Sequence, residues 1–278
     1  MTSRDLIQPE TLPLTRPDPL PVRYRVLSNV VWAPVFFTGT AVFGSLSLLA
    51  SLVDKDGRKQ HRIAQAWASF GLWIASSPVT VIGAENLPTA GPAVYAANHV
   101  SYMDTPVLFS ALRFQFRILA KQGLWKVPFI GWHLDRSGQI PVNTDNPKAS
   151  ISSLLVGVRA LKAGMPLVVF PEGGRALSGH PGAFASGPAY MAVRAQVPLV
   201  PMAIVGTYEL LPMHTRHFFP RPLALVVGKP IATTGYSTKG IEELTERLSG
   251  EISRLYYAHA NRQPPTAQEE PQATSHIP

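Results

Sequence analysis

The feature that most limits how this chain can fold is the segment from Val26 to Val53, which contains no charged residue. A helix rises about 1.5 Å per residue and about 20 apolar residues cross a bilayer, so this segment is long enough to span a membrane. Pro34, Gly39 and Gly44 interrupt it, which makes a re-entrant or interfacial helical hairpin an alternative to a single span. A buried pair of core helices in a soluble protein is the third possibility.

The flanks of this segment do not choose an orientation in the membrane, because basic residues occur on both sides in similar numbers. They are Arg16, Arg23 and Arg25 before the segment and Lys55, Arg58, Lys59 and Arg62 after it. Residues 1–25 are polar and rich in proline, which predicts a disordered leader. Downstream, Trp67, Phe70 and Trp73 recur at helical spacing and would suit a lipid interface, so residues 26–75 are expected to form a membrane-anchoring helical region.

Apolar runs and helical patterns alternate along residues 76–262. The runs that we interpret as strands are Phe116–Ala120, Leu167–Phe170, Leu199–Val205 and Leu223–Val227. This alternation predicts one α/β domain with a mixed, largely parallel sheet flanked by helices. Residues 263–278 contain no lysine or arginine and are rich in Pro, Gln and Glu, which predicts a disordered tail.

Two helices of this domain stand out in the sequence. The first is predicted to start near Pro147, to end at Gly164, and to bury Ile151, Leu154, Leu155, Val158 and Leu161. The second is predicted to start at about Thr238, with one apolar face made by Ile241, Leu244, Leu248 and Ile252.

Composition limits the partners of the chain. The formal net charge of +8 favours anionic partners. Because the sequence has no long basic run and no nucleic-acid-binding motif, we expect an anionic membrane surface rather than nucleic acid. The absence of cysteine excludes disulfides, thiolate nucleophiles and zinc–thiolate sites, and it agrees with an enzyme that faces the cytosol.

A histidine stands five residues before an aspartate in the segment Asn98-His99-Val100-Ser101-Tyr102-Met103-Asp104. Five positions along a helix turn a side chain by about 140°, so two helical residues at this spacing would point apart. We therefore expect His99 in a turn, after a short buried strand over Pro92–Ala97 and before a helix that Asp104 begins, with Asp104 as its N-cap residue. Such a pair suits general base catalysis, because a carboxylate fixes the tautomer of the imidazole. A capping aspartate beside a locally satisfied histidine is the alternative.

The segment Phe170-Pro171-Glu172-Gly173-Gly174-Arg175 follows a predicted buried strand. Its glycines permit backbone conformations that expose amide groups, and an arginine can grip phosphate through paired hydrogen bonds. Together these groups indicate an anion site. A plain turn with a solvated Arg175 is the alternative.

These two segments, with Glu85-Asn86-Leu87-Pro88 and Val197-Pro198-Leu199-Val200-Pro201, resemble the motif blocks of the 1-acylglycerol-3-phosphate (lysophosphatidic acid) acyltransferase family of glycerolipid acyltransferases. The resemblance covers roughly residues 65–230 and keeps the blocks in order. It implies that His99 and Asp104 are the catalytic pair. It also implies that Glu172, Gly173, Gly174 and Arg175 bind the acceptor, and that no metal or other cofactor takes part.

The implied reaction moves a fatty acyl group from acyl-CoA or acyl carrier protein to the free sn-2 hydroxyl of 1-acyl-glycerol-3-phosphate. The product is phosphatidic acid, a step of phospholipid biosynthesis, and the enzyme is expected at the membrane with its catalytic domain on the cytoplasmic side. Gly174 and Ala176 stand where the family usually has hydroxyl residues, so another lysolipid or glycerol-3-phosphate stays open as the acceptor.

Three alternatives to this mechanism are weaker. Ser101 lacks the setting of a nucleophilic serine, which disfavours an acyl-serine intermediate. His99, Asp104, His133 and Asp135 lack compact metal-ligand spacing. A non-catalytic, membrane-anchored binding protein for anionic lipid would keep the apolar segment and the basic surface without turnover.

Overall fold

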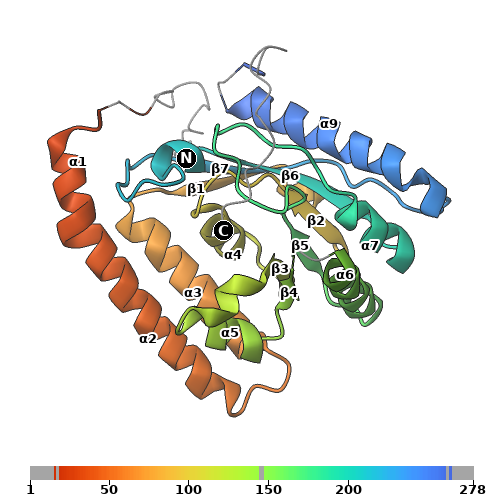
Figure 1. Ribbon diagram of the computed structural model, residues 1–278, viewed down its shortest axis with the longest axis horizontal. Helices are drawn as coiled ribbons and strands as arrows, with labels where there is room; N and C mark the ends of the chain where they lie inside the picture. The colour runs from red at the N-terminus through yellow and green to blue at the C-terminus, as the bar shows by residue number, and fades with distance from the viewer. Residues whose placement is uncertain (1–15, 17–18, 144–146, 261–262, 265–278) are drawn as a thin grey trace, which may run out of the picture.

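The computed structural model describes residue 16 and residues 19–143, 147–260 and 263–264 of the chain. The predicted leader and tail therefore lie largely outside the described residues. Within those residues, strands form one sheet in the order β1-β7-β6-β2-β5-β3-β4 (Figure 1). The strands are β1 (Val79–Ile82), β2 (Val94–Ala97), β3 (Arg117–Lys121), β4 (Ile140–Val142), β5 (Leu167–Val169), β6 (Leu199–Val205) and β7 (Leu223–Val227).

Neighbouring strands of this sheet are parallel, except that β6 and β7 are antiparallel. The predicted fold class, a mixed and largely parallel sheet with helices on both faces, is confirmed. The α-helices are α1 (Val22–Leu27), α2 (Ala33–Ser51), α3 (Arg58–Ile74), α4 (Asp104–Ala111), α5 (Ile130–Arg136), α6 (Pro147–Lys162), α7 (Gly187–Ala195), α8 (Thr207–Leu210) and α9 (Ile241–His259). A π-helical turn, η2 (Ser28–Trp32), and three 3₁₀ turns, η3 (Ala84–Asn86), η4 (Gln122–Lys126) and η5 (Thr238–Gly240), complete the order.

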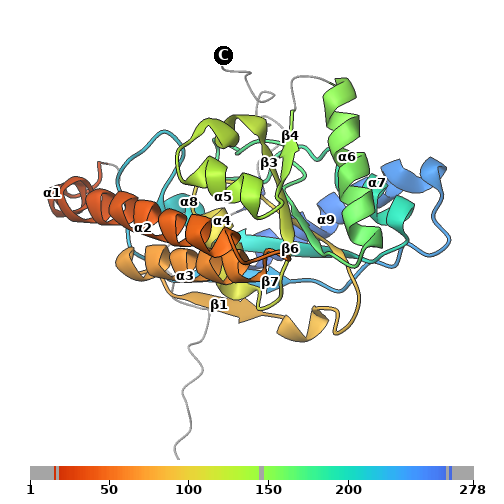
Figure 2. The same ribbon diagram turned by 90° about the horizontal axis from the view of Figure 1, so that it is seen from below.

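The central strand β2 is buried on both faces, as expected for a parallel sheet covered by helices. Tyr95 and Ala97 point into a core shared with α3 and α4, whereas Val94 and Ala96 point into a core shared with α6, α7 and α9. Figure 2 shows these two helical layers on opposite sides of the sheet. The carboxyl end of β2 is therefore held between two packed layers.

The two helices expected from the sequence are present, but one buried face was predicted too wide. In α9, Leu244, Leu248 and Ile252 are buried as predicted. In α6, Ile151 is 55% exposed and Leu155 is 40% exposed, so the prediction that both are buried is wrong. Helix α6 packs against α7 and the sheet on one side, and this contact buries Val158 and Leu161 and covers Leu154 only in part.

The apolar segment forms one continuous helix, Val22–Ser51, which is not interrupted at its proline or glycines. The π-helical turn ends two residues before Pro34, and the amide of Ala33 donates to the carbonyl oxygen of Ser28. The two glycines are contact points between helices. A Cβ at Gly39 would lie 2.3 Å from Cε1 of Phe70, and one at Gly44 would lie 2.6 Å from Cβ of Phe129.

Among the described residues, Val22–Ser51 is the one helix whose length and composition would allow it to cross a membrane, and 11% of its most apolar stretch is buried. That share is low for the core helix of a soluble protein. The helix lies along α3 and α5 rather than standing apart from the domain (Figures 1 and 2). Phe36 packs on Trp67 at 5.8 Å between ring centroids, so part of the predicted aromatic stripe is covered, whereas Trp73 is 75% exposed.

Candidate active site

The site begins where β2 ends, at Asn98. The side-chain Nδ2 of Asn98 donates to the carbonyl oxygen of Ile204 at 3.0 Å, and its Oδ1 accepts from the amide of Ile204 at 2.7 Å. This pair of bonds extends the contact between β2 and β6 by a side chain. It fixes the point at which the chain leaves the sheet and turns toward His99.

His99 and Asp104 contact each other as the spacing predicts. Nδ1 of His99 lies 2.8 Å from Oδ2 of Asp104, and the aspartate side chain is fully buried. The expectation that Asp104 begins the helix is confirmed, since it is the first residue of α4, whereas the N-cap position is occupied by Met103 and not by Asp104. Its carboxylate points back into the preceding turn, where Oδ2 also accepts from the amides of Val100 at 2.7 Å and Ser101 at 2.8 Å.

Thr207 completes the shell of donors around this carboxylate. It is the first residue of α8, which Gly206 alone separates from the end of β6, and its hydroxyl donates to Oδ1 of Asp104. The sequence analysis missed this residue, because more than a hundred positions separate it from Asp104 and no motif marks it. A buried polar residue that follows the carboxyl end of a central strand is the signal that could have found it.

The hydrogen bond to Asp104 sets the chemistry of the His99 ring. With the proton on Nδ1, Nε2 is left as a hydrogen-bond acceptor and can receive a proton. The ring stacks on Phe170, with centroids 3.8 Å apart and planes 11° apart. Burial lowers the pKa of His99 and outweighs the opposing effect of Asp104, so the imidazole is a neutral base near pH 7.

The second predicted segment holds the backbone of His99 on both sides. The amide of His99 donates to Oε1 of Glu172 at 2.8 Å, and its carbonyl oxygen accepts from the amide of Ala176 at 2.8 Å. Burial raises the pKa of Glu172 to about 8, although backbone hydrogen bonds from His99 and Gly182 oppose this shift. The structure therefore brings the two sequence segments together, and it directs the Glu172 carboxyl at the His99 turn.

The other predicted acceptor residues lie next to this turn. Gly173 has a φ of +68°, a conformation that favours glycine. The guanidinium carbon of Arg175 lies 4.4 Å from the centroid of the Tyr102 ring, within the turn that contains His99. Nε of Arg175 is buried without a hydrogen-bond partner in the described part of the chain. Arg175 is thus held beside the pair His99 and Asp104, called the dyad below, with part of its donor capacity unused.

The residues on which an acyl-serine or metal mechanism would depend make other contacts. The hydroxyl of Ser101 is buried and donates to the carbonyl oxygen of Leu211 at 2.7 Å, which leaves its proton unavailable to a base. His133 lies on α5, where its Nδ1 contacts the hydroxyl of Ser47 on α2 at 2.6 Å. Across the described residues, no three His, Asp or Glu side chains gather as metal ligands would.

Comparison with known proteins places this geometry in a family context. Residues 78–205 match the family model named Acyltransferase. The chain is 34% identical over 163 residues to the chloroplastic 1-acyl-sn-glycerol-3-phosphate acyltransferase LPAT1 of Arabidopsis thaliana, covering 58% of this chain and 45% of that protein. It is 28% identical over 235 residues to the 1-acyl-sn-glycerol-3-phosphate acyltransferase of Pseudomonas aeruginosa, covering 82% and 90%.

The chain thus spans about half the length of the chloroplastic relatives that it matches. Among solved structures, the 1-acyl-sn-glycerophosphate acyltransferase PlsC from Thermotoga maritima has the same fold, with a TM-score of 0.74 and 24% identity. That match covers 88% of this chain and 99% of the other.

The bond from Thr207 to Asp104 predicts the effect of removing one hydroxyl. Thr207→Val should lower the free energy of unfolding by about 1–3 kcal/mol, because an oxygen of a buried carboxylate loses its donor. Thr207→Ser should retain most of the stability. Denaturant unfolding measures the loss, with Thr245→Val as the control, since that hydroxyl only bonds the carbonyl oxygen of Ile241 in its own helix. Equal losses in the two valine variants would contradict this role.

The raised pKa of Glu172 predicts how stability depends on pH. Its contribution is fully present below the unfolded value of about 4.5 and is lost as the pH rises through about 8. Because glutamine mimics the protonated side chain and does not ionise, Glu172→Gln should remove this pH dependence of the stability. The Tm of the wild type should therefore fall relative to that of Glu172→Gln between pH 5 and pH 8. Parallel Tm curves would show that Glu172 is not protonated in the folded protein.

Proposed function

Because residues 78–205 of this chain belong to the acyltransferase family, we propose that the protein transfers a fatty acyl group to the free sn-2 hydroxyl of 1-acyl-glycerol-3-phosphate. The product is phosphatidic acid. The donor is an acyl thioester of coenzyme A or of acyl carrier protein. The observation that carries this proposal is the buried contact between His99 Nδ1 and Asp104 Oδ2, which leaves Nε2 as a base beside a cationic residue.

In the proposed reaction, Nε2 of His99 takes the proton of the acceptor hydroxyl while that oxygen attacks the thioester carbonyl. Asp104 keeps the ring in the required tautomer and stabilises the imidazolium that forms. The tetrahedral intermediate then collapses, the carbon–sulfur bond breaks, and the imidazolium returns the proton to the thiolate. No acyl-enzyme intermediate is needed, in keeping with the engaged hydroxyl of Ser101.

The acceptor is proposed to bind at Gly173, Gly174 and Arg175. Arg175 offers a planar, charged donor fork that suits a phosphate, and its position over Tyr102 keeps it beside the dyad. Lys121 ends β3 at the same edge of the sheet and adds a second cation. Glu172 belongs to the same segment, and its bond to the His99 amide supports a role in holding the base in place while its neighbours meet the acceptor.

The protein is proposed to work at a membrane surface, anchored by residues 26–75, with the catalytic domain on the cytoplasmic side where acyl thioesters are found. The long N-terminal helix supports this, because many of its large apolar side chains face outward, among them Val30 at 68% and Phe37 at 69% exposure. Its packing along α3 and α5 favours a helix that lies in the interface over one that crosses the bilayer.

Substitution of the proposed base tests the reaction. His99→Ala should lower turnover by at least about a hundredfold, since a general base contributes about 10²–10⁴ in rate. The assay combines lysophosphatidic acid with acyl-CoA or acyl carrier protein donors and measures thiol release, with His259→Ala at the end of α9 as the control. Binding to vesicles should be unchanged. Near-normal turnover in His99→Ala would disprove the assignment, and an absence of turnover in the wild type would favour a non-catalytic lipid-binding protein.

Substitution of Arg175 tests the acceptor. Arg175→Ala should weaken the use of lysophosphatidic acid by roughly 2–4 kcal/mol in kcat/KM, because a buried phosphate loses its partner. Arg175→Lys should recover only part of this, since a point charge cannot reproduce the planar fork. The KM of the thioester donor should change little. A raised donor KM with unchanged use of the acceptor would assign Arg175 to the donor instead.

A further inference from the structure

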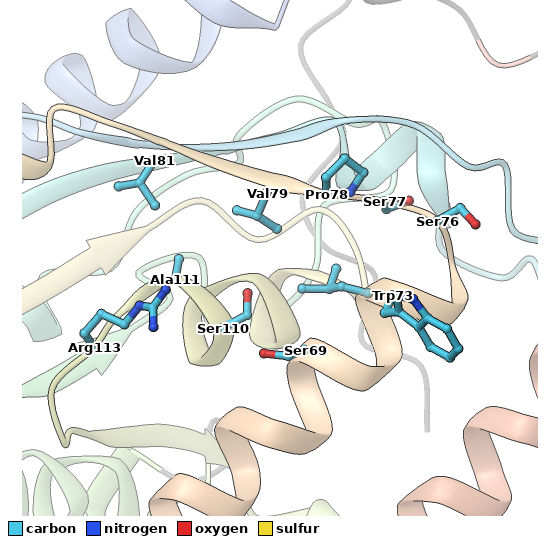
Figure 3. Close-up of a pocket in the computed structure, with 11 residues that line it drawn as sticks. Ser69, Trp73, Ser76, Ser77, Pro78, Val79, Val81, Ser110, Ala111 and Arg113 are labelled. Atoms are coloured by element: carbon cyan, nitrogen blue, oxygen red, sulfur yellow. The ribbon is translucent and has the colours of Figure 1, made fainter. Parts of the chain in front are cut away.

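A groove of about 410 Å³ lies between β1, α3 and the end of α4, outside the site described above. This volume is in the range of small-ligand sites, about 300–1,000 Å³. Figure 3 shows Arg113 at one end of the groove and Trp73 at the other, with Ser69 and Ser110 between them. None of these residues takes part in the proposed reaction.

Some polar side chains of the groove have no protein partner. Among the described residues, the exposed side chains of Arg113, Ser69 and Ser76 make no hydrogen bond or ion pair, whereas the hydroxyl of Ser77 donates to the carbonyl oxygen of Ala75 at 3.0 Å. Arg113 is the sole charged side chain that lines this part of the described structure. The hydroxyl of Ser110 donates to the carbonyl oxygen of Val107, so it can only accept. A ligand that satisfies the groove therefore carries negative charge and several acceptor oxygens, as a phosphate does.

Ser76 supplies a second, independent observation. It follows the C-cap of α3 with a φ of +50°, and the amide of Ser77 donates to the carbonyl oxygen of Leu72. This is the C′ position of a Schellman motif, where glycine is favoured because other residues are strained. The chain has serine there, and Ser76 lines the groove at the end opposite Arg113 (Figure 3). A strained residue in the wall of a groove indicates a function for that residue.

The opposite wall of the groove is apolar. Val79 and Val81 project from β1 toward the helices (Figure 3). Leu72 and Pro78 also line the groove. Trp73 adds an exposed indole on α3, the helix that packs directly against α2. A free inorganic phosphate would leave this wall uncovered. A ligand with an alkyl part would cover it and could arrive from a membrane surface at α2.

The cationic end of the groove is separate from the dyad. Helix α4 begins at Asp104 and ends at Ala111, two residues before Arg113. Eight helical residues span about 12 Å, so Arg113 lies at the far end of the helix from the dyad. A ligand on Arg113 would leave the catalytic site free.

We propose that this groove binds the phosphate ester of an amphiphilic lipid, with the phosphate at Arg113 and the alkyl part against β1. The ligand is a membrane phospholipid held outside the catalytic centre. It would tie the protein to anionic bilayers in addition to the apolar helix.

The tryptophan fluorescence of Trp73 reports on this site. It is obtained by subtracting the emission spectrum of Trp73→Phe from that of the wild type. The full chain in detergent is titrated, without acyl donor, with three probes: dihexanoylphosphatidic acid, dihexanoylglycerol and inorganic phosphate. Dihexanoylphosphatidic acid should shift the Trp73 emission, and Arg113→Gln should weaken its binding at least about fivefold. Arg194→Gln, which removes an exposed charge on α7, should not. Arg175→Ala should also leave this signal unchanged.

Several results would overturn the proposal. Equal weakening of binding by Arg113→Gln and Arg194→Gln would show that binding depends on the overall positive charge of the protein and not on Arg113. Equal binding of dihexanoylglycerol would leave an apolar groove without phosphate recognition, and equal binding of inorganic phosphate would leave an ion site without a lipid.

Ser76→Gly separates binding from folding. It relieves the positive φ, so it should raise the Tm. It should also weaken binding of dihexanoylphosphatidic acid by about threefold, because the lipid loses a contact at the end of the groove beside Trp73. A higher Tm with unchanged binding would show that Ser76 does not contact the ligand. Its positive φ would then not indicate a role in binding, which would contradict the proposal.

Discussion

The buried carboxylate of Asp104 is the constraint on which the rest of the site depends. An ionised carboxylate at zero exposure is costly unless donors surround it, and here the donors come from separate parts of the fold. The amides of Val100 and Ser101 come from the turn after β2, and the hydroxyl of Thr207 comes from the end of β6. The carboxylate therefore ties the first turn of α4 to two neighbouring strand ends, and it leaves His99 one orientation in which Nδ1 can donate. The same bonds that stabilise the buried charge set the direction of the proposed base.

The two carboxyl groups near His99 differ in their hydrogen bonds. Asp104 is surrounded by donors, whereas Glu172 receives backbone hydrogen bonds that do not offset its burial, and its pKa rises to about 8. A protonated Glu172 can still accept from the His99 amide, so it can hold the turn without adding a second negative charge beside Asp104. This division explains why the two motif segments, about seventy positions apart, form one unit. The first supplies the base and its partner, and the second fixes the backbone that carries the base.

Much of this could be predicted from the sequence, because the signals were local. Buried strands such as Leu199–Val205 appear as continuous apolar runs. The five-residue spacing shows that His99 and Asp104 could not face each other from one and the same helix. Thr207 could not be predicted, because its contact depends on two strand ends meeting in space. The exposed Ile151 of α6 was mispredicted for a related reason, since periodicity shows an apolar stripe but not how much of it a neighbour covers. The role of Gly44 as a contact with Phe129 also depends on packing that the sequence does not reveal.

The N-terminal helix shares its packing with the domain that carries the dyad. Trp32 is buried in the core that contains residues of α3 and α4, and the hydroxyl of Ser28 accepts from the amide of Phe218 at 2.8 Å. Further along, Ser47 contacts His133 of α5. These contacts span the length of the helix, so its exposed apolar face keeps a fixed position relative to His99. If that face lies in a bilayer surface, as we propose, the depth of the base is set by helix packing and not by a flexible linker. An acceptor hydroxyl near the head groups of a lysolipid could then meet Nε2 while its acyl chain stays in the membrane.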